Sequence, residues 1–401
     1  MVLTMDGFTG SAGATQASLP AWAHWLGLVA AACATAAFAV AAWSSALDLE
    51  ALLDAPAVPS AFSEPWAAAV VTPPELPELL SQTGLYAAAA GGPLHAEVLA
   101  FSPQYPLWSD GATKQRFLRL PPGTTIDGSD PDAWVFPVGT RFWKEFSFGR
   151  RVETRYIERR ADGSWTFASY VWDEAGRDAR LAPEVGVRGV AVLPKVGSGP
   201  QPLYHDIPSR DDCLACHEGG GARAPILGFS ALQLSGERDP SAPHAELKPA
   251  AAVDLERLLA RGLLAHYPKG LARPRIHAAT PEARASLGYL HGNCSGCHNQ
   301  RGPLSDLGLD FEERVGDEGS TERVLASIAG APSHFRLPGQ EHSLRVVPGA
   351  PEESVLSVRL GSRNVAQQMP PLGSKVVDQE ATALVAAWIE QLKSPAPTSA
   401  N

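Results

Sequence analysis

Two copies of the pentapeptide Cys-x-x-Cys-His constrain this chain more than any other feature of its sequence. They are Cys213-Leu-Ala-Cys216-His217 and Cys294-Ser-Gly-Cys297-His298. Two cysteines separated by two residues can each form a thioether with one vinyl group of the same porphyrin, and the next histidine is then held beneath the iron as its ligand. The pentapeptides therefore predict two covalently attached haem c groups, with iron bound by His217 and by His298.

Other chemistries of Cys-x-x-Cys pairs explain the pattern less well. Zinc ribbons usually place their two pairs about fifteen to twenty residues apart, which is much closer than here. A thioredoxin-like dithiol needs one pair only. Both stay open as alternatives, although they leave His217 and His298 without a role. Only Cys33 lies outside the motifs, so no framework of structural disulfides is expected.

An uncharged segment near the amino terminus predicts export. Residues 25–43 read WLGLVAAACATAAFAVAAW, and Ser44-Ser45-Ala46 follows as a small-x-small site suited to signal peptidase. The segment is also just long enough to span a bilayer. Residues 1–46 are thus expected to be a cleaved signal or a membrane anchor. Either one places the folded part in the periplasm or at the extracytoplasmic face of the cytoplasmic membrane.

The next segments differ in texture. Residues 47–80 are rich in Ala and Pro and read as a linker. Residues 81–205 contain short aromatic and β-branched runs separated by turn signals, which predicts an antiparallel β sandwich or barrel-like domain. Five tryptophans are expected to supply much of its core: Trp108, Trp134, Trp143, Trp165 and Trp172.

The basic run RRVETRYIERR lies within this β region. Its charged residues Arg151, Glu153 and Arg155 alternate with uncharged ones. Alternation predicts a strand with one solvated face, and we prefer that interpretation to a stripe that binds a partner. The net charge of -10 likewise argues against nucleic acid as a partner, because proteins that bind it concentrate positive charge.

The carboxy-terminal half changes to loops and then to helices. Residues 206–248 are expected to form a loop-rich segment around the first motif, and residues 249–395 a mainly helical domain around the second. One helix should begin at Thr280, as a cap followed by proline, and the last should begin at Asp378. The predicted fold class is therefore α+β, with a β domain followed by a helical domain.

Residues 280–392 resemble a class I cytochrome c domain. In that family a helix leads into Cys-x-x-Cys-His, a methionine loop reaches the far face of the haem, and a carboxy-terminal helix crosses the first. Here Ser286 and Leu290 precede Cys294 by eight and four residues, resembling the small-x-x-x-large pair at that crossing. Trp388 or Leu384 would be the partner on the last helix.

The same resemblance implies how the second iron is bound. Met369 lies in the proline-rich loop Gln-Met-Pro-Pro-Leu, which matches the methionine loop of the family and implies His298/Met369 ligation. Such ligation raises the reduction potential relative to two histidines. The resemblance thus implies an electron carrier that works with other redox proteins of the respiratory chain or periplasm.

The second ligand of the first iron is less defined by the sequence. The candidate histidines are His205, His244, His266, His277, His291, His334 and His342. We select His244, which follows the first motif, and expect that His291 borders the space between the two haems. An open first site would instead indicate a redox enzyme, peroxidase-like or oxidase-like.

The wider arrangement is similar to a group of bacterial exported proteins of unassigned activity. The likeness lies in YPLWSDGA and FPVGTRFWKEF followed by two Cys-x-x-Cys-His motifs. It implies the order of the domains and no substrate. A third possibility is therefore that the β domain binds a partner or ligand and that the haems serve as its redox relay.

Overall fold

The computed structural model describes residues 76–192, 203–219, 224–246, 249, 251–271 and 273–393. The predicted signal or anchor at residues 25–43 lies outside the described residues, as does most of the linker. Within the described part of the chain, no helix is both long enough and apolar enough to cross a membrane. The described residues belong to one compact unit that extends from residue 74 to the carboxy terminus.

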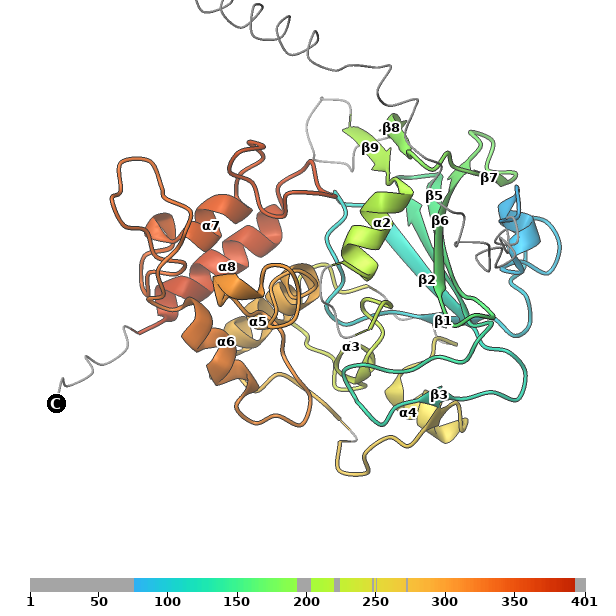
Figure 1. The fold of residues 1–401 in the computed structure, drawn as a ribbon, viewed down its shortest axis with the longest axis horizontal. Helices are drawn as coiled ribbons and strands as arrows, with labels where there is room; N and C mark the ends of the chain where they lie inside the picture. Colours follow the sequence, from blue (N-terminus) through green and yellow to red (C-terminus); the bar gives the residue numbers. More distant parts are fainter. Residues whose placement is uncertain are drawn as a thin grey trace, which may run out of the picture. The chain divides into compact units, whose positions relative to one another are not determined.

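A six-stranded antiparallel sheet occupies the amino-terminal half of the described chain (Figure 1). Its strands, in spatial order, are β1 (Leu99–Phe101), β2 (Thr113–Arg119), β4 (Arg141–Ser147), β5 (Arg151–Arg159), β6 (Trp165–Trp172) and β7 (Ala179–Leu181). Neighbours in this sheet follow one another along the chain, apart from β3; short turns connect β4 to β5 and β5 to β6, whereas longer loops connect β1 to β2 and β2 to β4. The turn between β5 and β6 places Gly163 at φ 85°, a conformation that glycine adopts without steric cost.

Two smaller sheets lie outside this one. They are the parallel pair β3 (Ile126–Asp127) with β10 (Leu264–Ala265) and the antiparallel pair β8 (Val187–Val192) with β9 (Leu203–Ile207). Strands and helices together confirm the α+β class. In place of a second large sheet, α3 (Ala231–Leu234) and α4 (Leu255–Ala260) pack into the same core as Leu118 and Phe142, because their apolar side chains cover the sheet as a second sheet would.

Both faces of the six-stranded sheet carry apolar rows. On one face Phe117, Trp143 and Tyr156 are cross-strand neighbours in a buried core. On the other face the corresponding row is Leu118, Phe142, Ile157 and Phe167. Three of the five predicted core tryptophans, Trp134, Trp143 and Trp172, are buried, whereas Trp108 and Trp165 are partly exposed.

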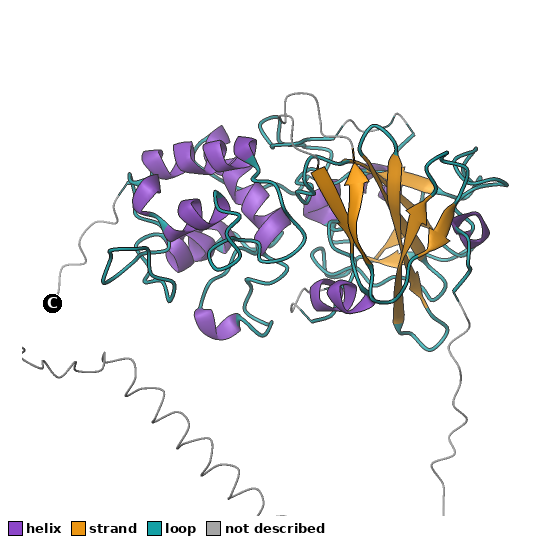
Figure 2. Ribbon diagram, turned by 90° about the horizontal axis from the view of Figure 1, so that it is seen from above, coloured by secondary structure: helices purple, strands orange, loops and turns teal. Residues whose placement is uncertain are grey.

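The carboxy-terminal part is helical, and Figure 2 shows its helices gathered apart from the strands. The helices are α5 (Pro281–Cys294), α6 (Ser320–Ile328), α7 (Val355–Leu360) and α8 (Gln379–Gln391), with the short 3-10 turns η2 (Ser305–Leu307) and η3 (Pro351–Glu353). A further 3-10 turn, η1 (Leu80–Thr83), precedes β1 in the chain. The predicted caps are confirmed. Thr280 accepts a hydrogen bond from the Ala283 N–H at 3.1 Å, and Asp378 accepts one from the Ala381 N–H at 3.1 Å.

Helices α5 and α8 pack against each other at the predicted position. Ser286 is fully buried, and its Oγ lies 3.5 Å from the carbonyl oxygen of Leu384. Leu290 and Trp388 are buried in the same core. The small serine lets the two backbones approach, so the expected contact of Ser286 with the last helix is present.

The loop between β1 and β2 packs against α5. The Tyr105 ring fills the space beside Gly288, where an added Cβ would lie 2.0 Å from Cε1 of that ring. At Gly292 a Cβ would lie 2.6 Å from the Tyr105 carbonyl oxygen. The second motif begins at Cys294, two residues after Gly292. Between them lies Asn293, whose Oδ1 accepts a hydrogen bond from the Trp108 N–H at 2.7 Å. The YPLWSDGA segment therefore joins the sheet to the helix that carries Cys294.

Replacing Gly288 by alanine should destabilise the protein. The same change in an open helical position stabilises by roughly 1 kcal/mol. Here the new methyl group must displace the Tyr105 ring, and overpacking of this kind costs about 1–3 kcal/mol. Urea unfolding should show a net loss of free energy for G288A and no loss for the control G270A, whose Cβ would meet nothing within 4 Å. Stability equal to the parent protein would contradict the packing described.

Candidate haem-attachment site

The first motif lies on a short helix, α2 (Arg210–His217). Ser209 caps it, since Oγ of Ser209 accepts from the Asp212 N–H at 3.1 Å and the Asp212 carboxylate accepts from the Ser209 N–H at 3.0 Å. The Gly- and Pro-rich sequence predicts a loop-rich segment here, whereas the structure has a helix. The overlooked signal is the pair Ser209-x-x-Asp212, a capping box that begins a helix even in a Gly- and Pro-rich segment.

His217 is held in one orientation by the backbone. Its Nδ1 donates to the carbonyl oxygen of Pro225 at 2.6 Å, and its ring lies 5.0 Å from that of Phe167 on β6. A proton on Nδ1 leaves the lone pair of Nε2 free, which is how metal-binding histidines are oriented. Burial lowers the pKa of His217 to about 4, against the opposing effect of the Pro225 bond. The imidazole is thus neutral at neutral pH, the form that binds iron.

A cavity of about 280 Å³ lies at this motif. It is lined by all three functional residues of the first motif and by Cys297 of the second. One wall is apolar and comes from the sheet and the segment after α2, with Phe101, Phe142, Ile157, Phe167, Ile226 and Leu227. Cys216 and Cys297 are 81 residues apart in the sequence. The structure therefore brings parts of both motifs to one site.

The second motif begins where α5 ends. The N–H of His298 donates to the Cys294 carbonyl at 2.9 Å, and the His298 ring meets the Phe311 ring edge-on with centroids 5.9 Å apart. Burial lowers the pKa of His298, and the positive charges of Arg359 and Arg345 lower it further. Its Nδ1 is buried and has no hydrogen-bond partner among the described residues. In contrast to His217, the ring of His298 is therefore not held by a hydrogen bond at Nδ1.

Met369 lies in the same part of the fold as His298. Its N–H donates to the carbonyl oxygen of Arg359 at 3.0 Å, and Arg359 is the residue whose charge acts on His298. Arg359 is thus a common neighbour of the two. Met369 does not line the cavity at the first motif, and its coordination of iron stays a prediction.

His244 is placed at the start of α8. Its Nε2 lies 2.7 Å from Oδ1 of Asp378, and its Nδ1 lies 3.3 Å from Oε2 of Glu380. The ring also packs against Trp108, with centroids 4.7 Å apart. His244 is not among the residues that line the cavity. The structure therefore does not bring it to His217, and its predicted role as the second iron ligand gains no geometric support.

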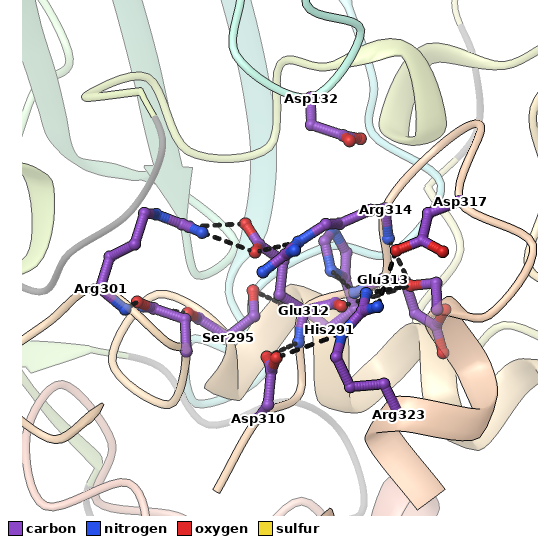
Figure 3. A network of polar contacts seen from close by, with 12 residues as sticks. Asp132, His291, Ser295, Arg301, Asp310, Glu312, Glu313, Arg314, Asp317 and Arg323 are labelled. Atoms are coloured by element: carbon purple, nitrogen blue, oxygen red, sulfur yellow. Dashed lines mark hydrogen bonds and ion pairs between the residues drawn. The ribbon is translucent and has the colours of Figure 1, made fainter. Parts of the chain in front are cut away.

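His291 lines the cavity at the first motif. Its Nδ1 accepts a hydrogen bond from the backbone N–H of Glu313 at 3.1 Å (Figure 3). That bond places the proton of a neutral ring on Nε2. The imidazole is therefore engaged with the backbone of the following loop and is not oriented as a free metal ligand.

A charged network surrounds His291 (Figure 3). Arg301 pairs with Glu312 through two hydrogen bonds of 2.9 and 2.7 Å, and Arg314 donates to the same carboxylate at 2.9 Å. Glu313 instead accepts from Oγ1 of Thr321 at 3.1 Å. Burial raises the pKa of Glu313 to about 7. Glu312 is thus ionised, whereas its neighbour Glu313 can exchange a proton near neutral pH.

The predicted solvated face of β5 is wrong. Glu153 is fully buried and accepts from Nε of Arg155 at 2.8 Å, while Nε2 of His205 lies 2.8 Å from its other oxygen. His205 belongs to β9, and α2 packs on the neighbouring strand β6. The alternation of charges correctly predicts the strand β5. However, β9, which comes later in the chain, covers the face of β5 that carries Glu153.

Comparison of the chain with models of protein families, with curated proteins and with solved structures finds no match in any of the three. Among the residues that the structure describes, no three His, Cys, Asp or Glu side chains are grouped so as to hold a metal ion. The basis for assigning a function is therefore the geometry of the two motifs and of the cavity at the first motif.

Glu153 should make the stability depend on acid pH. Burial would raise the pKa of Glu153, but Arg155 and the hydrogen bond from His205 outweigh it and lower the pKa to about 2. A lowered pKa means that the ionised group stabilises the fold above its ordinary pKa of 4.5, and that this contribution is lost as pH falls toward 2.

The variant E153Q tests this effect. We expect a loss of about 2–3 kcal/mol of unfolding free energy at pH 7, measured in urea, which shrinks as the pH is lowered through that window. The exposed control E174Q should behave like the parent protein. An unchanged pH dependence in E153Q would show that the buried carboxylate is not the responsible group.

Proposed function

We propose that this protein is an exported dihaem c-type cytochrome that transfers electrons between redox partners. The observation that carries the proposal is the geometry of His217. Its neutral imidazole is fixed by Pro225 with Nε2 free, beside two free thiols, Cys213 and Cys216, that face a cavity with one apolar wall. Thioether formation, iron ligation and exclusion of water each need one of these features.

The residues at the first motif fit a covalently bound haem. When bound, haem supplies one-electron chemistry between ferric and ferrous iron. Cys213 and Cys216 would hold it, His217 would bind the iron, and the aromatic wall of Phe142 and Phe167 would pack against the ring and exclude water. An apolar wall limits the access of water to the iron, which suits electron transfer.

The second motif supports the same proposal in a different way. Its cysteines follow a helix that packs against the last helix at Ser286, and burial lowers the pKa of His298, which favours the neutral imidazole that can bind iron. Met369 is proposed as the ligand on the other side of the iron. Cys297 faces the cavity of the first motif, so the two attachment sites are near enough to favour electron exchange between them.

A second candidate function is a redox enzyme with an open first site, peroxidase-like or oxidase-like. It is favoured by the surroundings of the cavity. Apart from His217, His291 is the one imidazole among the described residues that line it, and its Nδ1 is occupied by the Glu313 N–H. Glu313 also lines the cavity and has a pKa near 7, as expected for a group that passes protons to a bound reactant.

The number of haems tests the main proposal directly. We expect the exported, matured protein to carry two haems, measured by the pyridine haemochrome spectrum and by mass. The double variant C213A/C216A and the double variant C294A/C297A should each retain one, because each motif attaches its own group. A matured protein without covalent haem would refute the proposal, and zinc in its place would favour the alternative metal.

Met369 should determine the properties of one iron only. In M369A we expect one of two low-spin ferric signals to be lost in the paramagnetic resonance spectrum, with the second unchanged. The matched control L372A alters an exposed residue of the same loop and should keep both signals. A high-spin ferric signal that binds cyanide in the unmodified protein would favour the enzyme, whereas two low-spin signals would favour the carrier.

A further inference from the structure

One half of the sheet face at the cavity is basic. Arg116 on β2, Lys144 on β4 and Arg155 on β5 are direct cross-strand neighbours, and all three line the cavity. They lie on the same face as the apolar row of Phe142 and Ile157, which is two residues away on each strand. Adjacent like charges on a sheet repel one another, so this row needs negative charge to be stable.

The protein supplies only part of that charge. Arg116 pairs with Glu246, and Arg155 pairs with Glu153 at 2.8 Å. Lys144 forms no ion pair with a described residue; its Nζ lies 5.0 Å from the centre of the Phe146 ring. Burial and the neighbouring charges of Arg116 and Arg155 lower the pKa of Lys144. The row therefore has one basic side chain more than the carboxylates that pair with it, and a further anion is needed to favour the charged form of Lys144.

The unpaired cation is close to the first motif. The charge of Lys144 acts on Cys216 and on His217, and that of Arg155 acts on both cysteines. The cavity wall is thus divided into an apolar part, next to the His217 ring at Phe167, and a basic part centred on Lys144. A ligand that matches both parts has a flat apolar body and a carboxylate at its edge.

We propose that Lys144, flanked by Arg116 and Arg155, binds a propionate carboxylate of the porphyrin attached at Cys213 and Cys216. This inference rests on the proposed function and assigns a role to the β sheet that the motifs alone do not. The sheet then provides more than a wall, since its positive charge favours the ferrous over the ferric iron and raises the reduction potential of the first site.

The test uses the full matured protein with Lys144→Met, Lys144→Arg and the control Lys269→Met, which removes an exposed lysine. Haem content is measured first, and the two potentials are then measured by spectroelectrochemical titration. We expect two haems in every variant. One potential should shift to more negative values in K144M, return toward the parent value in K144R, and stay unchanged in K269M. The propionate band of the resonance Raman spectrum should change in K144M, change less in K144R, and stay unchanged in K269M.

The outcomes separate this inference from the proposed function. Absence of haem from the parent protein refutes the proposed function. Two haems with both potentials and the propionate band unchanged in K144M refute the role of Lys144 while leaving the proposed function intact. If K144M does not fold, K144R decides, because a changed propionate band with both haems retained is expected only if the lysine contacts that group. A shift of potential in the parent protein on adding acetate would show that the row binds free carboxylates, and would overturn the assignment.

Discussion

The packing of Tyr105 against Gly288 determines where the second Cys-x-x-Cys-His motif lies relative to the sheet. The ring occupies the space that a side chain at Gly288 would take, and the next turn of α5 ends at Cys294. The same loop continues to Trp108, whose Nε1 donates to the carbonyl of Val376 at 2.9 Å. A single loop of the β region thus fixes both α5 and the segment before α8, and the cavity shared by Cys216 and Cys297 depends on it.

The parts of this arrangement that depend on local sequence could be predicted. Thr280 followed by proline begins α5, Asp378 begins α8, and the small side chain of Ser286 indicates where the two helices pack. Each of these signals depends on residues close together in the sequence or within residues 280–392. They describe the helices around the second motif well and say little about the first.

What could not be predicted depends on contacts between distant residues. The charges of β5 alternate as on a solvated strand, yet Glu153 is covered by His205, which lies 52 residues further along the chain. Burial of that face turns Arg155 from a surface residue into part of a cavity wall. No periodicity within β5 distinguishes these two cases. The two motifs share a sequence pattern but differ in their surroundings. The first packs against the sheet, whereas the second follows α5 in the helical part.

Four cysteines are free thiols in the described structure, and Cys216 and Cys297, one from each motif, border the same cavity. Disulfides form readily in the compartment to which the chain is expected to be exported. A bridge between these two residues would tie the motifs together and block the cavity, and a bridge within one motif would consume its thiols. Thioether formation would then prevent these disulfides as well as hold the haem. During maturation, haem attachment would compete with disulfide formation for the same thiols.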